Sequence, residues 1–121
     1  MSSSRRTVLV TGGTGTLGRE LVARFAGARR TDVVSLARRS PGQPAAESVP
    51  NVRLVSGDVR AGTTLGLAAA DRAVLRETVT DIVHCAADTA FNRSLAESRA
   101  TNVEGTRAVL AFARECPALE R

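Results

Sequence analysis

The sequence predicts an α/β fold in which helices cover both faces of a doubly wound parallel sheet. Short apolar runs alternate with stretches of helical periodicity, which is the order that a parallel sheet requires. These runs are apolar throughout rather than at every second residue, as expected for strands buried on both faces. The first run leads directly into a glycine cluster, V-L-V-T-G-G-T-G-T-L-G at residues 8–18.

The alternation predicts strands, helices and one long loop in a definite order. The expected strands are Thr7–Thr11, Asp32–Ala37, Asn51–Ser56 and Asp81–Ala86. The expected helices cover 17–28, a short segment within 61–80, and 95–116, whereas the proline-containing segment 38–50 is expected to be a loop. Right-handed crossovers then give the strand order 3-2-1-4, with a ligand crevice between the first and fourth strands.

Apolar residues at helical spacing predict the buried face of each helix. For the first helix they are Leu17, Leu21, Val22, Phe25 and Ala26, and for the second Leu67, Ala70, Val74 and Leu75. For the last helix they are Ala100, Val103, Thr106, Val109, Leu110 and Ala113.

Length and composition indicate one ordinary globular domain. The chain has 121 residues, of which 43% are hydrophobic and 24% charged. Its net charge is +5 and every basic residue is arginine, but the arginines are scattered and the chain has no Trp and no Tyr to stack on bases. Nucleic-acid binding is therefore not expected. No apolar run is long enough for a membrane span and no secretory signal is evident, so we expect a cytoplasmic location without membrane association.

The cysteines and the histidine do not form a metal-binding pattern. Cys85 and Cys116 lack metal-type spacing, and we expect reduced, structural thiols. His84 is the only histidine and lies inside an apolar run, so a structural strand residue is favoured over a metal ligand or catalytic base.

The glycine cluster predicts a dinucleotide-binding turn between strand and helix. Gly12 would allow a sharp turn, Gly15 would let a pyrophosphate approach the backbone, and Gly18 would let the helix lie close to the sheet. The N-terminus of the following helix would direct its free N–H groups at the phosphates. Gly13 is extra to the G-x-x-G-x-x-G spacing. The alternative is a glycine-rich turn that holds no ligand.

The residues at the end of the second strand indicate which dinucleotide is bound. A carboxylate usually stands there when NAD is bound, but this sequence has Arg38 and Arg39. A guanidinium attracts a 2′-phosphate and can bind it through two hydrogen bonds, so NADP is favoured over NAD. The alternative is a solvated loop pair, above all for Arg39.

The spaced motifs resemble the short-chain dehydrogenase/reductase superfamily. The T-G-x-x-G-x-x-G form is similar to its extended and atypical branches. The segments H-C-A-A-D-T-A-F at residues 84–91 and T-N-V-E-G-T-R at 101–107 resemble its thioester-reductase and fatty-acyl-reductase branch. The resemblance implies that Asp58 and Val59 bind adenine and that Asn102 supports the active site through a proton-relay water. It also brings Asp88 and Phe91 near nicotinamide or substrate.

These observations give one set of expected site residues and no catalytic residue beyond the supporting Asn102. The expected cofactor-binding residues are Gly12, Thr14, Gly15, Thr16, Leu17, Gly18, Arg38, Arg39, Asp58, Val59, Ala86 and Ala87.

The sequence departs from the family at its catalytic residues. The resemblance calls for a Tyr with a Lys four positions later, and this chain contains neither. We therefore expect residues 1–121 to be the N-terminal part of one Rossmann-type NADP-binding domain, in a longer reductase of acyl thioesters carried by a carrier protein or CoA. A sugar-nucleotide epimerase or dehydratase parent, and a non-catalytic NADP-binding sensor or scaffold, stay open as alternatives. Without a fifth strand, residues 82–85 would form an exposed apolar edge that favours self-association.

Overall fold

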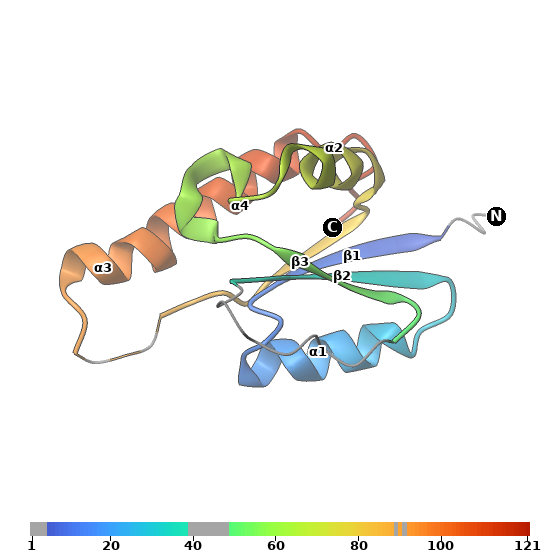
Figure 1. Cartoon of the computed structure of the whole chain (residues 1–121), viewed down its shortest axis with the longest axis horizontal. Coiled ribbons are helices and arrows are strands. Elements are labelled where there is room, and N and C mark those ends of the chain that lie inside the picture. The colour runs from blue at the N-terminus through green and yellow to red at the C-terminus, as the bar shows by residue number, and fades with distance from the viewer. Residues whose placement is uncertain (1–4, 39–48, 89, 91) are drawn as a thin grey trace.

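Four parallel strands form the sheet, in the spatial order β3-β2-β1-β4 (Figure 1). The computed structural model describes residues 5–38, 49–88, 90 and 92–121. The strands are β1 (Arg6–Thr11), β2 (Thr31–Ala37), β3 (Val52–Ser56) and β4 (Asp81–His84). The predicted strands and their order are confirmed, with bounds that differ by no more than two residues.

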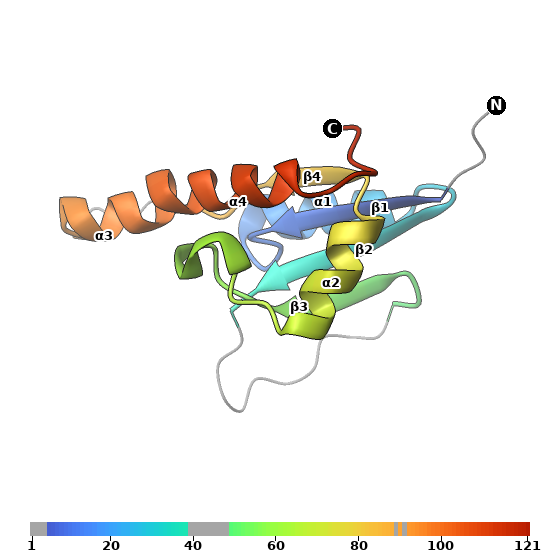
Figure 2. The same ribbon diagram turned by 90° about the horizontal axis from the view of Figure 1, so that it is seen from above.

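Helices cover both faces of this sheet (Figures 1 and 2). The helix α1 (Thr16–Ala26) lies on one face, and α2 (Ala69–Thr78) and α4 (Gly105–Arg114) lie on the other. A 3₁₀ segment, η1 (Val59–Thr64), follows β3. The long predicted helix is a run of α3 (Leu95–Arg99), a π-helical turn η2 (Ala100–Glu104) and α4. No helix in the described ranges is both long and apolar enough to cross a membrane.

Each face of the sheet has its own core. Under α1 the buried strand residues are Val8, Val10 and Val33. The larger core joins the other face to η1, α2 and α4. Its members are Leu9, Val34, Leu36, Val55, Val59, Leu65, Leu67, Leu75, Val79, Ala108, Val109, Phe112 and Cys116. The strands are therefore buried on both sides, which explains their continuous apolar runs.

The predicted buried faces of the helices are wrong in part. Leu17 is 64% exposed, Val74 50% and Leu110 58%, and Ala70 and Val103 are also exposed. In α4 the buried residues are Gly105, Ala108, Val109 and Phe112, of which only Val109 was predicted. A Cβ on Gly105 would lie 2.8 Å from Val59 Cγ2, so this helix packs on η1 through its smallest residue. Hydrophobic spacing does not detect such a contact.

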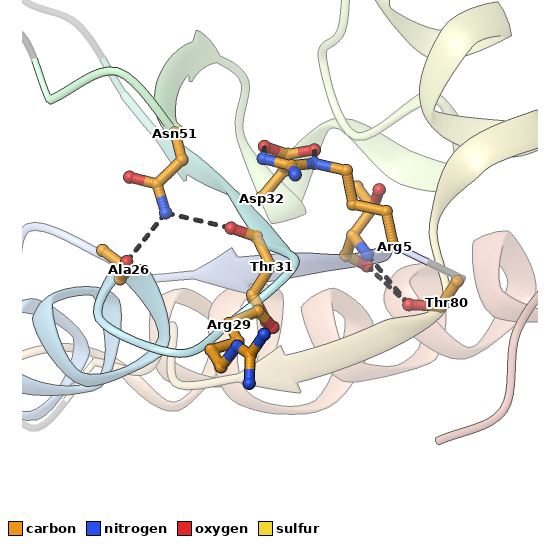
Figure 3. Close-up of polar contacts among 8 residues, drawn as sticks. Arg5, Ala26, Arg29, Thr31, Asp32, Asn51 and Thr80 are labelled. Atoms are coloured by element: carbon orange, nitrogen blue, oxygen red, sulfur yellow. Dashed lines mark hydrogen bonds and ion pairs between the residues drawn. The ribbon is translucent and has the colours of Figure 1, made fainter. Parts of the chain in front are cut away.

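Polar side chains join the amino-terminal ends of the strands, away from the loops that follow them (Figure 3). Asn51 Nδ2 donates to the carbonyls of Ala26 and Thr31, at 2.8 and 2.9 Å. The Arg5 guanidinium pairs with Asp32, with Nη2–Oδ1 at 2.7 Å. The carboxyl ends of the strands are left to form the site.

The outer edge of β4 is partly paired. Glu120 N donates to Thr80 O at 2.7 Å, and Ile82 N donates to Arg121 O at 2.8 Å. These bonds lay the last residues alongside β4, so the edge expected to be open is covered at its beginning. Cys85 and Cys116 are both free thiols, as expected.

Candidate cofactor-binding site

The carboxyl ends of the four strands border a cavity of about 490 Å³. It is lined by the glycine loop, the ends of β2 and β3, the segment after β4, and the start of α3 and η2. The predicted residues that line it are Gly12, Thr14, Gly15, Arg38, Asp58, Val59, Ala86 and Ala87. Asp88, which was expected near nicotinamide or substrate, also lines it. The lining residues that were not predicted to bind the cofactor are Leu36, Ala37, Gly57, Arg60, Cys85, Arg93, Glu97, Ala100 and Thr101.

The three fingerprint glycines have different steric surroundings. Gly12 has φ +69°, and a Cβ there would lie 2.7 Å from Ala86 N. A Cβ on Gly18 would lie 2.0 Å from the carbonyl oxygen of Gly12, so Gly18 packs against the glycine loop itself and not against the sheet. A Cβ on Gly15 would meet only Gly12 O, at 3.4 Å, so the loop is open toward the cavity at this residue.

Gly13 also lies in close contact with a strand, although the spacing treats it as extra. A Cβ at this position would lie 2.0 Å from Ser35 Oγ and 3.1 Å from Ser35 Cβ. The loop therefore crosses β2 so closely that a side chain would displace Ser35. Sequence spacing alone gives no sign of this contact.

The first turn of α1 begins beside the cavity. Gly15 is its N-cap, no side chain caps the helix, and no acidic residue stands in the first turn. The first amides of a helix have no carbonyl partner within it and carry a partial positive charge. The predicted residues Thr16, Leu17 and Gly18 are not among those that line the cavity. Only their backbone amides remain as candidates for binding.

The ends of β2 and β3 bring charged groups to the same rim. Arg38 follows β2 and lines the cavity, whereas Arg39 lies outside the described residues. Asp58 follows β3 and accepts from Arg60 N at 2.9 Å and from Arg60 Nη2 at 3.0 Å. These bonds to Arg60 lower the pKa of Asp58, and the charge of Arg38 contributes to the same direction. Asp58 is thus an ionised N-cap of η1 with Arg60 held beside it.

The segment after β4 is fixed by side chains from two directions. Thr11 Oγ1 accepts from the amides of Cys85 at 3.1 Å and Ala86 at 3.2 Å. From η2, Asn102 Oδ1 accepts from Asp88 N at 2.7 Å, and its Nδ2 donates to Asp88 O at 2.9 Å. Asn102 therefore ties the helical run to this segment without lining the cavity itself.

The start of α3 contributes residues that sequence reasoning missed. Arg93 lines the cavity and its Nε lies 3.2 Å from Asp88 Oδ2. Ser94 and Glu97 form a capping box, in which Ser94 Oγ accepts from Glu97 N at 3.1 Å and Glu97 Oε2 accepts from Ser94 N at 3.0 Å. The S-x-x-E spacing could have located this helix start. Phe91 lies outside the described residues.

The arrangement defines a class of protein. A parallel sheet whose first strand enters a glycine loop, with a cavity at the carboxyl ends of the strands, is a Rossmann-type dinucleotide-binding domain. No group of three or more His, Cys, Asp or Glu that could hold a metal ion occurs among residues 5–38, 49–88, 90 and 92–121.

Comparison with known proteins gives the family. Residues 43–121 match the model of the NAD-binding family described as male sterility protein, and the chain belongs to this family. The chain is 39% identical over 118 residues to the polyketide synthase-nonribosomal peptide synthetase ACE1 of Pyricularia oryzae, a match that covers 93% of this chain and 3% of that protein.

Solved structures agree with this assignment. The terminal R domain from the myxalamid PKS-NRPS biosynthetic pathway has a TM-score of 0.81 and 27% identity, covering 98% of this chain and 34% of that chain. A thiolation-reductase di-domain from an archaeal non-ribosomal peptide synthetase shares the fold, with a TM-score of 0.72 and 18% identity over 94% of this chain and 26% of that chain. The chain thus spans about a third or less of these relatives.

Proposed function

We propose that this chain binds NADP(H) and is the cofactor-binding part of a reductase that acts on acyl thioesters attached to a carrier protein or to CoA. The observation that carries the proposal is the cavity at the carboxyl ends of the strands, which joins an open glycine loop to an arginine-rich rim. Similarity to a reductase di-domain and to a PKS-NRPS terminal domain supports the thioester class.

The residues of the cavity fit a dinucleotide. Gly15 leaves room for a phosphate where a Cβ would stand, and the uncapped first turn of α1 offers backbone N–H donors to it. Across the cavity the backbone of Ala86 and Ala87, without long side chains, lets the cofactor lie close to the end of β4. Asp58 and Val59 stand at the β3 side, where adenine would be held.

Arg38 would select the phosphorylated cofactor. It stands directly after β2, at the place where a carboxylate would repel a 2′-phosphate. Arg60 lines the same cavity but is held by Asp58, so Arg38 is the stronger candidate for a direct contact. When bound, NADPH would supply a hydride to the acyl carbon, with release of the thiol. The Tyr and Lys expected from the family do not occur in the 121 residues.

Cofactor titration tests the binding proposal. NADPH, NADP⁺ and NADH are titrated into the chain and into the Arg38→Asp and Arg107→Asp variants; Arg107 is exposed on α4 and does not line the cavity. Charge-assisted hydrogen bonds are worth about 1.5–3 kcal/mol, so wild type should favour NADPH over NADH by roughly 10- to 100-fold. Arg38→Asp should remove this preference, and Arg107→Asp should retain it.

The possible results separate the parts of the proposal. Absence of binding for every nucleotide would refute the cofactor function. Equal affinity for NADPH and NADH, unchanged in Arg38→Asp, would refute the NADP assignment but leave dinucleotide binding intact. The substrate class is tested in the longer reductase that we propose, where an S-acyl pantetheine thioester should release one thiol for each NADPH consumed if the product is an aldehyde, and one thiol for every two NADPH if it is an alcohol. Turnover of a nucleotide sugar instead would favour the epimerase alternative.

A further inference from the structure

His84 lies behind the cavity wall and is hydrogen-bonded through both ring nitrogens. Its Nδ1 lies 2.6 Å from Thr11 Oγ1, and its Nε2 lies 3.1 Å from Thr106 Oγ1 on α4. Burial lowers the pKa of His84, which favours the neutral ring. None of the three side chains lines the cavity.

The hydrogen-bond partners of Thr11 determine whether Nδ1 of His84 carries a proton. Thr11 Oγ1 already accepts two backbone N–H groups, from Cys85 and Ala86. A hydroxyl oxygen has two lone pairs and one proton, so the remaining capacity of Thr11 is to donate. It therefore donates to His84 Nδ1, which carries no proton.

The hydrogen-bond partners of Thr106 indicate the same tautomer, because they determine the protonation of Nε2 of His84. Thr106 Oγ1 donates to the carbonyl of Asn102 at 3.0 Å, so it is available as an acceptor for the ring. His84 Nε2 therefore carries the proton and donates to Thr106. A directed chain results, from the amides after β4 through Thr11, His84 and Thr106 to the backbone of η2.

We infer that His84, as the neutral Nε2–H tautomer, is a positioning residue that holds the segment after β4 in the conformation that receives the cofactor. The inference rests on the proposed function. This series of hydrogen bonds links Thr11 to Asn102. Thr11 binds the amides of Cys85 and Ala86, and the side chain of Asn102 binds both backbone groups of Asp88. His84 thus connects the two anchors of the cavity wall.

The position of this wall matters because it touches the glycine loop. The Ala86 amide lies 2.7 Å from the place that a Cβ on Gly12 would occupy. The backbone of the two loops is therefore in close contact, and a shift of Ala86 changes the space over the glycine loop. Loss of the hydrogen bonds of His84 should therefore weaken cofactor binding, although none of the groups that form them lines the cavity.

The tautomer is tested directly by NMR. Because the chain contains one histidine, a long-range ¹H–¹⁵N spectrum at a pH where the ring is neutral shows a single imidazole. We expect a protonated Nε2 and an unprotonated Nδ1. The Nδ1–H tautomer, or rapid exchange between the two forms, would overturn the inference whether or not the chain binds a cofactor.

The positioning role is tested by the pair Thr106→Val and Thr106→Ser with NADPH titration. The Val variant removes the hydroxyl and should bind NADPH roughly three- to tenfold more weakly, as expected for one lost hydrogen bond. The Ser variant retains the hydroxyl and should restore both affinity and the wild-type ring spectrum. Circular dichroism confirms that each variant is folded. If the Val variant is not, Thr106→Ala, which also lacks the hydroxyl and should bind NADPH as weakly, replaces it.

The outcomes distinguish this inference from the proposed function. Wild-type protein that binds no dinucleotide would refute both. Wild-type protein that binds NADPH, with equal affinity in a folded Thr106→Val variant, would refute the positioning role alone.

Discussion

Substituting alanine at Gly15 and at Gly18 should separate cofactor binding from folding. Both glycines belong to the same fingerprint, in which they stand three residues apart. Their surroundings differ: a Cβ on Gly18 would lie 2.0 Å from Gly12 O and 2.7 Å from Gly12 C, whereas a Cβ on Gly15 would meet only Gly12 O at 3.4 Å. The first contact is with backbone atoms that no side-chain rotation can move.

The sizes of the two effects follow from these contacts. In Gly18→Ala the loop must move by roughly an ångström, and overpacking of this kind costs about 1–3 kcal/mol. Alanine regains about 1 kcal/mol of helix propensity, so at the upper end the variant loses about 2 kcal/mol of unfolding free energy. For a domain of this size that is a fall in Tm of roughly 8 °C. Gly15 has φ −76°, which alanine adopts freely, so Gly15→Ala should change stability by less than about 1 kcal/mol.

NADPH affinity should be reduced strongly by Gly15→Ala, the variant that changes stability least. The methyl of Gly15→Ala would occupy the space proposed for a phosphate and should weaken NADPH binding by at least about tenfold. Thermal unfolding is followed by circular dichroism, and NADPH fluorescence reports binding without interference, since the chain has no Trp and no Tyr. A Gly18→Ala variant more stable than wild type, by the full gain in helix propensity, would refute the packing argument. Wild-type NADPH affinity in Gly15→Ala would refute the phosphate placement.

Two further predictions concern stability and self-association. Burial lowers the pKa of His84 below its ordinary 6.5, so the folded state binds its proton less well than the unfolded state. The contribution of His84 to the free energy of unfolding is therefore fully present above pH 6.5. It is lost as the pH falls from 6.5 through the pKa of the folded state, with a slope of at most about 1.4 kcal/mol per pH unit. Urea titrations between pH 5 and 8 should show this slope in wild type and not in His84→Gln. Removing Glu120 and Arg121 frees Thr80 O and Ile82 N at the edge of β4 and should cause concentration-dependent association on sizing columns, and an unchanged elution volume would contradict the role assigned to that edge.

The strands were predictable because burial on both faces produces a simple pattern. Each strand is an apolar run bounded by polar or small residues, and the right-handed crossover rule then determines their order. The buried faces of α2 and α4 were predictable only in part, through Leu75 and Val109. The contact of Gly105 with Val59 and the exposure of Leu110 depend on which helix meets η1, and this is a property of the tertiary structure.

The candidate site was predictable where it depends on the end of a strand. Gly12, Arg38, Asp58 and Ala86 each follow a strand, and the carboxyl ends of parallel strands meet at one edge, so their convergence follows from topology. Arg93, which precedes α3, and the lining residues Glu97, Ala100 and Thr101 could not be found this way. They reach the cavity because the helical run extends over this edge, which depends on the loop that precedes it.

The fourth strand is as much a part of the candidate site as the glycine loop. A glycine fingerprint is usually interpreted as a property of one strand, one turn and one helix. Here Gly12 is required because Ala86 stands against it, and Thr11, the last residue of β1, accepts the amides of Cys85 and Ala86. The shape of the glycine loop and the position of the opposite cavity wall are therefore set by the same contacts. It follows that a substitution confined to the β4 side, such as Thr106→Val, can change cofactor affinity without altering any residue of the fingerprint.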